Sequence, residues 1–187
     1  KQAAVGRRGV LKGLLLLAGT GGVGWAGYRE VREGPWTADY HTPVGQRQAL
    51  TLADGTQLEL NTNTALDVRY DNHQRLLVLR QGEVMITSAP DKAGRPLRVQ
   101  TANGTVEALG TRFLVKLEDQ GTRLSVLQSA VAAHPLSNPE EQILHEGQQV
   151  LLRSDGLGSM VALNPGADAW TRGRLVVDNA RLSDLVH

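Results

Sequence analysis

Residues 52–70 read LADGTQLELNTNTALDVRY, and this stretch indicates the fold class. Leu58 and Leu60 are separated by one polar residue, and the same alternation returns in the TALDVRY that ends the stretch. A hydrophobic period of two is typical of β-strands that bury one face. Asp54-Gly55, just ahead of Leu58, has the composition of a hairpin turn. The stretch therefore predicts short strands joined by tight turns.

The same alternation continues through most of the chain. Apolar residues two positions apart occur at Leu50 and Leu52, Leu66 with Val68 and Tyr70, Val84 and Ile86, Leu97 and Val99, Phe113 with Val115 and Leu117, and Leu124 and Val126. Turn signals separate these runs at Asp71-Asn72, Asn103-Gly104, Gln120-Gly121 and Asp155-Gly156. About ten short strands at this spacing favour a sandwich, a barrel or a solenoid-like stack of β-turns, and periodicity alone leaves all three open. Residues 135–141 (PLSNPEE) predict an exposed loop, since two prolines cannot continue a central strand.

Charge and cysteine content exclude several classes of function. Twenty Lys and Arg residues stand against nineteen Asp and Glu residues, and the formal net charge of +1 provides no large basic field for binding nucleic acid. The chain has no cysteine, which rules out disulfides, thiol catalysis and cysteine zinc sites. The five histidines are scattered without metal-ligand spacing, so we expect neither a metal nor a cofactor.

The segment from Gly9 to Tyr28 reads GVLKGLLLLAGTGGVGWAGY, and its only charge is on Lys12. About twenty residues of this character suffice to cross the hydrocarbon core of a bilayer. Basic residues precede the segment, and no acidic residue occurs before Glu30. The positive-inside bias therefore predicts a cytoplasmic N-terminus and a single crossing, with everything after Arg29 outside.

The basic flank also carries a possible export signal. Arg7 and Arg8, in the run RRGVLK, resemble a twin-arginine motif, which serves the export of folded domains. Gly24-Trp25-Ala26 offers a small-x-small cleavage site, so a cleaved signal peptide is the alternative to a retained anchor.

Changes in composition predict five regions in the chain. These are a cytoplasmic flank at 1–8, a transmembrane helix or export signal at 9–28, a linker at 29–45, a periplasmic β domain at 46–164 and the start of a small α+β domain at 165–187. The last region follows Asn164-Pro165-Gly166, after which Ala169 to Val177 (AWTRGRLVV) predicts a strand and Asn179 to Val186 the start of a helix.

Four blocks in a fixed order make the sequence similar to the FecR family. They are LADGTQLELNTNTALDVRY at 52–70, LLVLRQGEVMI at 76–86, ALGTRFLV at 108–115 and AWTRGRLVVDNARLSDLV at 169–186. The similarity covers nearly the whole chain after the linker and is close to the iron-siderophore branch of the family. Four blocks in the family's order are far more specific than any single one.

The resemblance implies an anti-sigma regulator of the inner membrane. In the family, a cytoplasmic N-terminal segment binds an extracytoplasmic-function (ECF) sigma factor, and a periplasmic C-terminal region contacts the signalling domain of a TonB-dependent outer-membrane receptor. By this plan the sigma-binding segment would precede Lys1, and a short domain similar to the N-terminal domains of secretins and TonB-dependent receptors would start near Trp170. Envelope proteases are further expected partners.

Self-cleavage is also implied by the resemblance. Family members of this kind cut themselves at a Gly-Thr bond within the block that matches ALGTRFLV, so Gly110-Thr111 is the expected site. Thr111 Oγ would attack the Gly110 carbonyl in an N-to-O acyl shift, and water would hydrolyse the ester. A hydroxyl nucleophile needs a base, oxyanion donors or strain in the bond. Gly-Thr also occurs at positions 19, 55, 104 and 121, so an ordinary turn entering the strand of Phe113 is the alternative.

No base for Thr111 can be named from the sequence. Glu107 and Arg112 flank the bond, but strand alternation turns one or both away from the side that Thr111 occupies. The paired acids Asp54 and Glu59 are of the type found in glycosidase or metal sites, but Asp54-Gly55 has the composition of a hairpin turn, and we favour the turn.

Trp170, Leu175 and Val177 predict an apolar face for binding a partner, or else the packed junction between two domains. A membrane-tethered β-sandwich enzyme, a carbohydrate-binding module and an envelope scaffold are the alternative classes of function. An enzyme or a sugar-binding module would need a convergent catalytic set or clustered aromatics, and the aromatic content is only 4%. We therefore expect a regulator without enzymatic turnover.

Overall fold

The computed structural model describes residues 37–138 and 140–174 of the chain. The predicted transmembrane segment at 9–28, the export motif at Arg7 and Arg8, and the predicted helix from Asn179 lie outside these residues. Within the described ranges, no helix combines the length and the apolar character needed to span a membrane.

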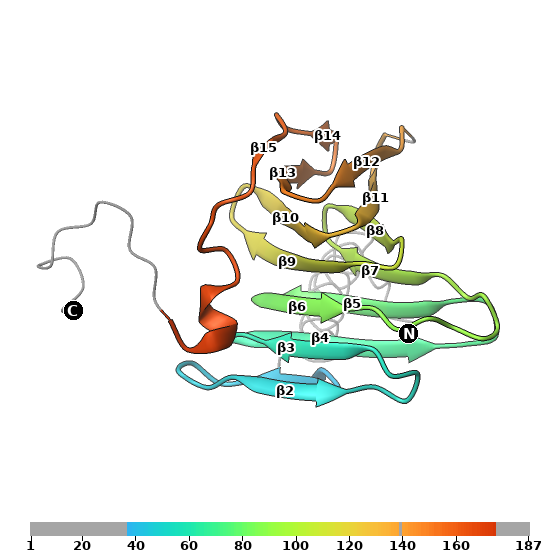
Figure 1. Ribbon diagram of the computed structural model, residues 1–187, viewed down its shortest axis with the longest axis vertical. Helices are drawn as coiled ribbons and strands as arrows, with labels where there is room; N and C mark the ends of the chain where they lie inside the picture. Colours follow the sequence, from blue (N-terminus) through green and yellow to red (C-terminus); the bar gives the residue numbers. More distant parts are fainter. Residues whose placement is uncertain (1–36, 139, 175–187) are drawn as a thin grey trace, which may run out of the picture.

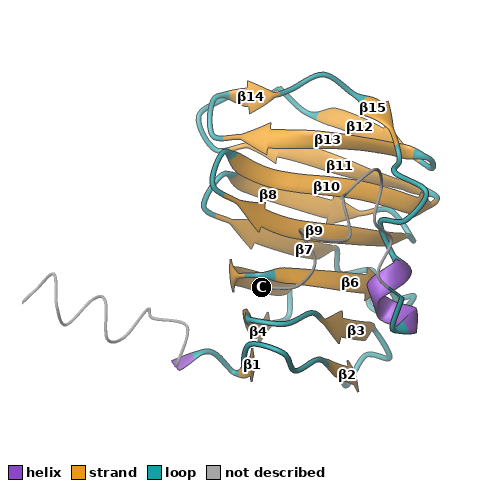
Figure 2. Cartoon of the chain, turned by 90° about the vertical axis from the view of Figure 1, so that its left-hand side faces the viewer, coloured by secondary structure: helices purple, strands orange, loops and turns teal. Residues whose placement is uncertain are grey.

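Two β-sheets packed face to face make up most of the described molecule (Figures 1 and 2). Sheet A contains β1 (Tyr40–Thr42), β4 (Thr64–Tyr70), β5 (Arg75–Gln81), β7 (Leu97–Thr101), β8 (Gly104–Ala108), β11 (Ala130–Pro135) and β12 (Gln142–His145). Sheet B contains β2 (Gln48–Thr51), β3 (Gln57–Leu60), β6 (Glu83–Thr87), β9 (Arg112–Glu118), β10 (Gly121–Gln128), β13 (Gln148–Arg153), β14 (Gly156–Leu157) and β15 (Val161–Ala162). The prediction of a mainly β fold is confirmed.

The chain passes back and forth between the sheets while it advances along both of them. Sheet A has the strand order β1-β4-β5-β7-β8-β11-β12, and sheet B has the order β14-β13-β10-β9-β6-β3-β2, with β15 also paired to β13. In each sheet the strand numbers therefore rise steadily from one edge to the other. Neighbours are antiparallel except for β5 and β7, which are parallel. The fold is a sandwich wound like a solenoid, so it combines two of the arrangements that periodicity left open.

The core between the sheets is built from alternating apolar residues, many of which the sequence analysis singled out. Burying one such side chain stabilises the fold by about 1.5–3 kcal/mol. The side chains buried in this core include Leu58, Leu60, Leu66, Leu77, Leu79, Val84, Ile86, Val99, Phe113, Val115, Leu124, Val126, Val131, Leu144 and Leu152.

The predicted turns join consecutive strands of one sheet. At Asp54-Gly55, which connects β2 to β3, the N–H of Leu52 donates to the Thr56 carbonyl (2.8 Å) and the N–H of Gly55 donates to the Leu52 carbonyl (2.9 Å). Gly55 has a φ of +89°, a conformation that favours glycine. The signals at Asp71-Asn72, Asn103-Gly104, Gln120-Gly121 and Asp155-Gly156 likewise lie at the β4–β5, β7–β8, β9–β10 and β13–β14 connections.

The β domain begins before residue 46. Strand β1 lies inside the range expected to be a linker and pairs with β4. Asp39 adds to this pairing, because its N–H donates to Asp67 Oδ1 (3.2 Å) and its own carboxylate accepts from the Val68 N–H (2.9 Å). The linker expectation failed here because β1 is three residues long, too short to show a hydrophobic period.

Residues 169–172 form a 3-10 helix, η2 (Ala169–Arg172), where a strand was expected. The Asp168 carboxylate accepts two hydrogen bonds from the Arg172 guanidinium, at 2.8 and 2.9 Å. A charge pair four residues apart favours helical geometry, and Gly173, with a φ of 68°, ends the turn. The apolar pattern of the sequence did not reveal helix η2, because Ala169 is its one buried residue.

Candidate functional site

Gly110 and Thr111 lie in the short connection that carries the chain from β8 in sheet A to β9 in sheet B. Gly110 is exposed and has a φ of +71°, whereas the side chain of Thr111 turns inward and the residue is only 3% exposed. A Cβ added at Gly110 would meet no atom within 4 Å. The carbonyl side of the bond is therefore open to solvent, and the hydroxyl side is enclosed by the protein.

The Thr111 hydroxyl donates a hydrogen bond of 2.5 Å to the Gln128 carbonyl. The register of β9 and β10 shifts between Val126 and Gln128, so that Gln128 stands opposite Arg112. This bulge brings the Gln128 carbonyl next to Thr111. A carbonyl oxygen orients the hydroxyl but does not remove its proton, so Gln128 is not a general base.

Ser88 holds the backbone of Thr111 from the other side. The Ser88 hydroxyl accepts a hydrogen bond from the Thr111 N–H (2.9 Å) and donates to the Thr111 carbonyl (3.2 Å). The Ser88 N–H donates to the same carbonyl (3.0 Å). Thr87 at the end of β6 pairs with Arg112 at the start of β9, and the two strands are antiparallel. Ser88, which follows Thr87, therefore lies beside Thr111, which precedes Arg112.

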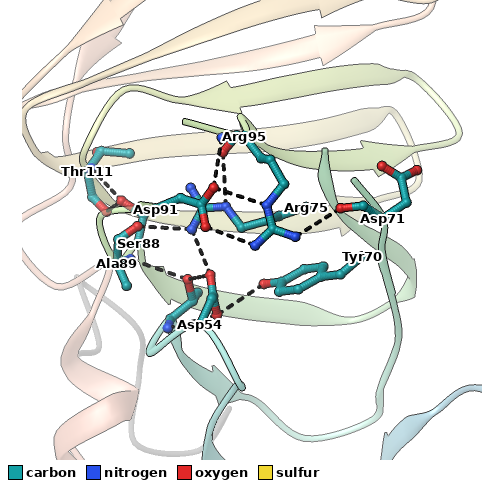
Figure 3. Close-up of polar contacts among 10 residues, drawn as sticks. Asp54, Tyr70, Asp71, Arg75, Ser88, Ala89, Asp91, Arg95 and Thr111 are labelled. Atoms are coloured by element: carbon teal, nitrogen blue, oxygen red, sulfur yellow. Dashed lines mark hydrogen bonds and ion pairs between the residues drawn. The ribbon is translucent and has the colours of Figure 1, made fainter. Parts of the chain in front are cut away.

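A buried ion pair fixes the segment that contains Ser88 (Figure 3). The side chains of Asp54 and Arg75 are 5% and 7% exposed, and the Arg75 guanidinium lies 2.7 Å from Asp54 Oδ2. Arg75 also donates to the Ala89 carbonyl (2.9 Å), and the Ala89 N–H donates to Thr56 Oγ (3.3 Å). Thr56 Oγ in turn donates to Asp54 Oδ2 (2.7 Å). The carbonyl of Ala89 is thus held by Arg75 and its N–H by Thr56, directly beside Ser88.

The environment keeps the charges of this network fixed. Burial by itself raises the pKa of Asp54, but hydrogen bonds from Thr56 and Arg75 and the charge of Arg75 lower the pKa below its ordinary value of 3.8. Burial, together with the neighbouring Asp54 carboxylate, raises the pKa of Tyr70 to about 12. Near neutral pH, Asp54 is therefore ionised, and Tyr70 stays protonated with its hydroxyl 3.5 Å from Asp54 Oδ1.

A cavity of about 370 Å³ adjoins the Gly110 side of the bond. Gly110, Ser88, Asp91 and Arg95 are among the residues that line it. Asp91 and Arg95 form a two-pronged ion pair with contacts of 3.0 and 2.9 Å. Hydrogen bonds from Arg95 hold the pKa of Asp91 well below its ordinary value, so this carboxylate is a weak base. The cavity has room for water beside the bond.

The residues that flank the bond are engaged elsewhere. Glu107 accepts a hydrogen bond from Arg98 (2.9 Å) on the neighbouring strand, and Arg112 lies 3.9 Å from Asp168. Both therefore point away from Thr111, as strand alternation predicts. Within the described ranges, no group of three or more acidic or histidine side chains could hold a metal ion.

Another Gly-Thr pair, Gly55-Thr56, has a carboxylate at its hydroxyl. The Thr56 N–H donates to Asp54 Oδ1 (3.1 Å), and Thr56 Oγ lies 2.7 Å from Asp54 Oδ2. The lowered pKa of Asp54 and its ion pair with Arg75 make this carboxylate a weak base, so it does not activate the Thr56 hydroxyl. The hydrogen bonds between Asp54 and Thr56 are those of a turn. The two Gly-Thr pairs differ at the amide nitrogen, which meets a carboxylate at Thr56 and a hydroxyl at Thr111.

Trp170, one of the predicted partner-binding residues, lies against the outer face of sheet B. Arg47, just ahead of β2, donates to the Trp170 carbonyl (2.6 Å), and its guanidinium stands 6.0 Å from the centre of the Trp170 ring. Leu114 and Met85 alternate with core residues and so face outward, yet they are only 3% and 1% exposed. Leu114 and Trp170 line a common cavity of about 420 Å³.

The segment around Trp170 therefore packs on the β domain. A junction with a second domain, which the sequence analysis left beside partner binding, stays a prediction. The Trp170 Nε1–H is buried and has no hydrogen-bond partner among the described residues. Leu175 and Val177, the other two predicted partner residues, lie outside the described ranges. Their role and that of Trp170 in binding a partner stay predictions.

Comparison with known proteins gives one family match. Residues 38–132, which include both sides of the Gly110-Thr111 bond and the Asp54–Arg75 pair, match the family model described as FecR protein. The chain belongs to the FecR family. No curated protein matches it.

Two solved structures have a similar fold. Both are crystal structures of a candidate anti-sigma factor from Parabacteroides distasonis. One has a TM-score of 0.65 at 24% identity and covers 79% of this chain and 70% of its own. The other has a TM-score of 0.63 at 25% identity, with coverage of 79% and 71%. The wound sandwich is therefore an arrangement that this FecR-family chain shares with known structures.

Proposed function

We propose that this FecR-family chain is an anti-sigma regulator that relays a signal from a TonB-dependent siderophore receptor to an ECF sigma factor. The match of residues 38–132 to the family carries the proposal. The likeness of the whole β domain to candidate anti-sigma factors supports it. In this role the protein acts by contacts with other proteins and has no turnover of a substrate.

The proposed location is the inner membrane, with the N-terminus in the cytoplasm and the β domain in the periplasm. The apolar run at 9–28 and its basic flank support this orientation. The sigma factor would be bound on the cytoplasmic side, and the receptor's signalling domain and the envelope proteases on the periplasmic side.

The proposed maturation step is self-cleavage at Gly110-Thr111 by an N-to-O acyl shift. Three features of the geometry support it. The nucleophilic hydroxyl is enclosed and oriented by Gln128. The glycine before it has a positive φ. The carbonyl side borders a cavity through which water could reach an ester. Such a cut happens once in the life of each chain.

Affinity capture of the natural full-length protein from iron-starved cells tests the proposal. We expect an ECF sigma factor and a TonB-dependent receptor among the captured proteins, identified by mass spectrometry. The same protein with residues from Leu175 onward removed keeps helix η2 and is the matched control, and it should lose the receptor while keeping the sigma factor. Capture of neither partner, together with binding or hydrolysis of a glycan, would contradict the proposal and favour a tethered carbohydrate-active module.

A further inference from the structure

We propose that Ser88 is a catalytic residue of the self-cleavage reaction, which passes a proton to the amide nitrogen of Thr111 as the bond to Gly110 breaks. The inference rests on the self-cleavage proposed above. It assigns a task to a residue that lies 23 positions from Thr111 in the sequence.

The position of the Ser88 hydroxyl carries the inference. Its oxygen is 2.9 Å from the nitrogen of the scissile bond and 3.2 Å from the Thr111 carbonyl oxygen. Among the side chains in the described residues, that of Ser88 is the one whose hydrogen bond reaches this nitrogen. Ser88 and Gly110 also line the same cavity, so Ser88 borders the space open to water.

The acyl shift requires a proton at this nitrogen. The bond from Thr111 Oγ to the Gly110 carbonyl carbon forms, and the bond from that carbon to the Thr111 nitrogen breaks. Thr111 Oγ loses one proton, and the nitrogen gains one to leave as an amine. An amide anion is too basic to leave at neutral pH, so the proton must reach the nitrogen as the bond breaks.

Ser88 can complete this transfer without moving its oxygen. When Thr111 Oγ adds to the Gly110 carbonyl, the nitrogen loses amide resonance, becomes pyramidal and inverts, so that its lone pair takes the place of the N–H that pointed at Ser88 Oγ. Rotation about the Ser88 Cβ–Oγ bond then turns the hydroxyl proton from the Thr111 carbonyl to the nitrogen. The proton released by Thr111 Oγ passes to the oxygen of Gly110, on the side that borders the cavity, and water there carries it on to Ser88 as the ester carbonyl forms, so the protons balance.

The surrounding contacts hold Ser88 in place for this task. Its own N–H is bound to the Thr111 carbonyl, and the next residue, Ala89, is held at its N–H by Thr56 and at its carbonyl by Arg75. Arg75 also bonds the Arg95 carbonyl (3.1 Å) at the far end of the same segment. The catalytic oxygen therefore sits on a rigid support, as proton transfer over a fixed distance requires.

Cleavage of the pulse-labelled full chain, followed by mass spectrometry in a reconstituted translation system, tests the inference. We expect Ser88→Ala to slow cutting after Gly110 about 100-fold near pH 7.5, within the usual range for losing a general acid. Ser88→Thr keeps a hydroxyl and should retain most of the rate. In Ser88→Ala the proton must come from solvent, so its rate should rise as the pH falls to 6, more steeply than the wild-type rate.

Ser129→Ala is the matched control. Ser129 is exposed, and its hydroxyl donates to the Leu109 carbonyl (3.1 Å) near the same bond without touching the nitrogen. The Ser129→Ala chain should be cut at the wild-type rate. Thermal unfolding should show that Ser88→Ala and Ser129→Ala are both folded. A wild-type rate in Ser88→Ala beside an uncut Thr111→Ala would overturn the role of Ser88 alone. A wild-type chain that stays intact would overturn self-cleavage itself, and this inference with it.

Discussion

Arg75 holds a nine-residue connection at both of its ends, and a single carboxylate balances its charge. The segment 88–96 carries the chain from β6 to β7, and Arg75 bonds the carbonyls of Ala89 and Arg95 within it. A buried ion pair of this kind contributes little net stability compared with apolar packing, but removing one partner leaves an uncompensated charge. Asp54 and Arg75 are therefore best understood as the residues that fix the shape of the segment beside Thr111.

Replacing Asp54 tests this view through pH. The pKa of Asp54 is lowered in the folded protein, so its stabilisation is present above its unfolded pKa of about 4 and is lost as the pH falls through the lower folded value. We expect Asp54→Asn to reduce the free energy of unfolding by about 3 kcal/mol at pH 7. The variant should also show a shallower loss of stability below pH 4. Urea unfolding at pH 7, 5 and 3 measures both effects.

The exposed turn residue Asp155 supplies the control for that measurement. Asp155→Asn should change the free energy of unfolding by less than about 0.5 kcal/mol at pH 7, as is usual for surface positions. Equal stability of Asp54→Asn and the wild type at pH 7 would show that the ion pair does not fix the segment.

Thr111 is predicted to be the nucleophile of self-cleavage. Thr111→Ala removes the atom that would form the ester and should leave the chain uncut, while Thr111→Ser retains some cutting. The alanine variant should stay folded, because it loses one hydrogen bond worth about 1 kcal/mol. Mass spectrometry of the fragments should give a new N-terminus at Thr111, and hydroxylamine should accelerate the cut.

Gly110→Ala separates backbone conformation from steric access. The added Cβ meets no atom within 4 Å, so any slowing must come from the positive φ, which costs a non-glycine residue about 1–2 kcal/mol. A new N-terminus at Thr56, or normal cutting by Thr111→Ala, would remove Thr111 from the mechanism.

The sequence indicated Thr111 only through resemblance, and it gave no signal for Ser88. Five Gly-Thr pairs look alike in the sequence. Two residues far from Thr111 in the sequence, Ser88 and Gln128, distinguish it from the other pairs. Strand register brings Ser88 to Thr111, and a bulge brings Gln128 there. Asp54 was correctly interpreted as a turn residue, but its pairing with Arg75 depends on a contact across 21 residues.

The elements of the β domain followed closely from local patterns. Alternating apolar residues and turn dipeptides predict strands and hairpins because both depend on neighbouring residues alone. The pairing order of the strands, including the parallel β5–β7 pair, cannot be predicted in this way, since it depends on how the chain crosses between the sheets. Strand β1 and helix η2 were missed because three or four residues are too few to show a period.

Helix η2 should be part of the stable β domain. Trp170→Ala removes the ring that lies beside Arg47 and shares a cavity with Leu114. Because this exposes outward-facing apolar residues of sheet B, we expect a loss of about 2–3 kcal/mol in the free energy of unfolding. The change should also allow protease cleavage between Asn164 and Arg174. Thermal unfolding and limited proteolysis measure the two effects.

Arg172→Ala is the matched change within the same helix, since Arg172 is exposed and pairs with Asp168 four residues away. It should cost no more than about 0.5 kcal/mol, the usual value of such a pair. If Trp170→Ala behaves in the same way, η2 does not contribute to the stability of the domain.

At the scale of the whole molecule, the proposed orientation can be tested with a reporter. A reporter that requires export for activity, fused after Gly45, should be active, and the protein should remain with the inner membrane. Replacing Arg7 and Arg8 together by Lys keeps the charge but removes the guanidinium groups, so it should block export only if the twin-arginine route is used. Unchanged export would reduce the motif to a basic flank. Release of a soluble protein beginning near Gly27 would show that the segment is a cleaved signal.

The winding order of the strands has a consequence for how the protein is made. After β1 and β2, each strand that leaves the ribosome finds a sheet neighbour among strands already synthesised, because the numbering rises steadily along both sheets. The sandwich can therefore grow from its β1–β2 end without waiting for the C-terminal half. Gln128 in β10 reaches Thr111 only after that growth has passed the middle of the domain. A nascent chain that ends before β10 should thus be folded in part and still uncut, which places the timing of the cut under the control of translation.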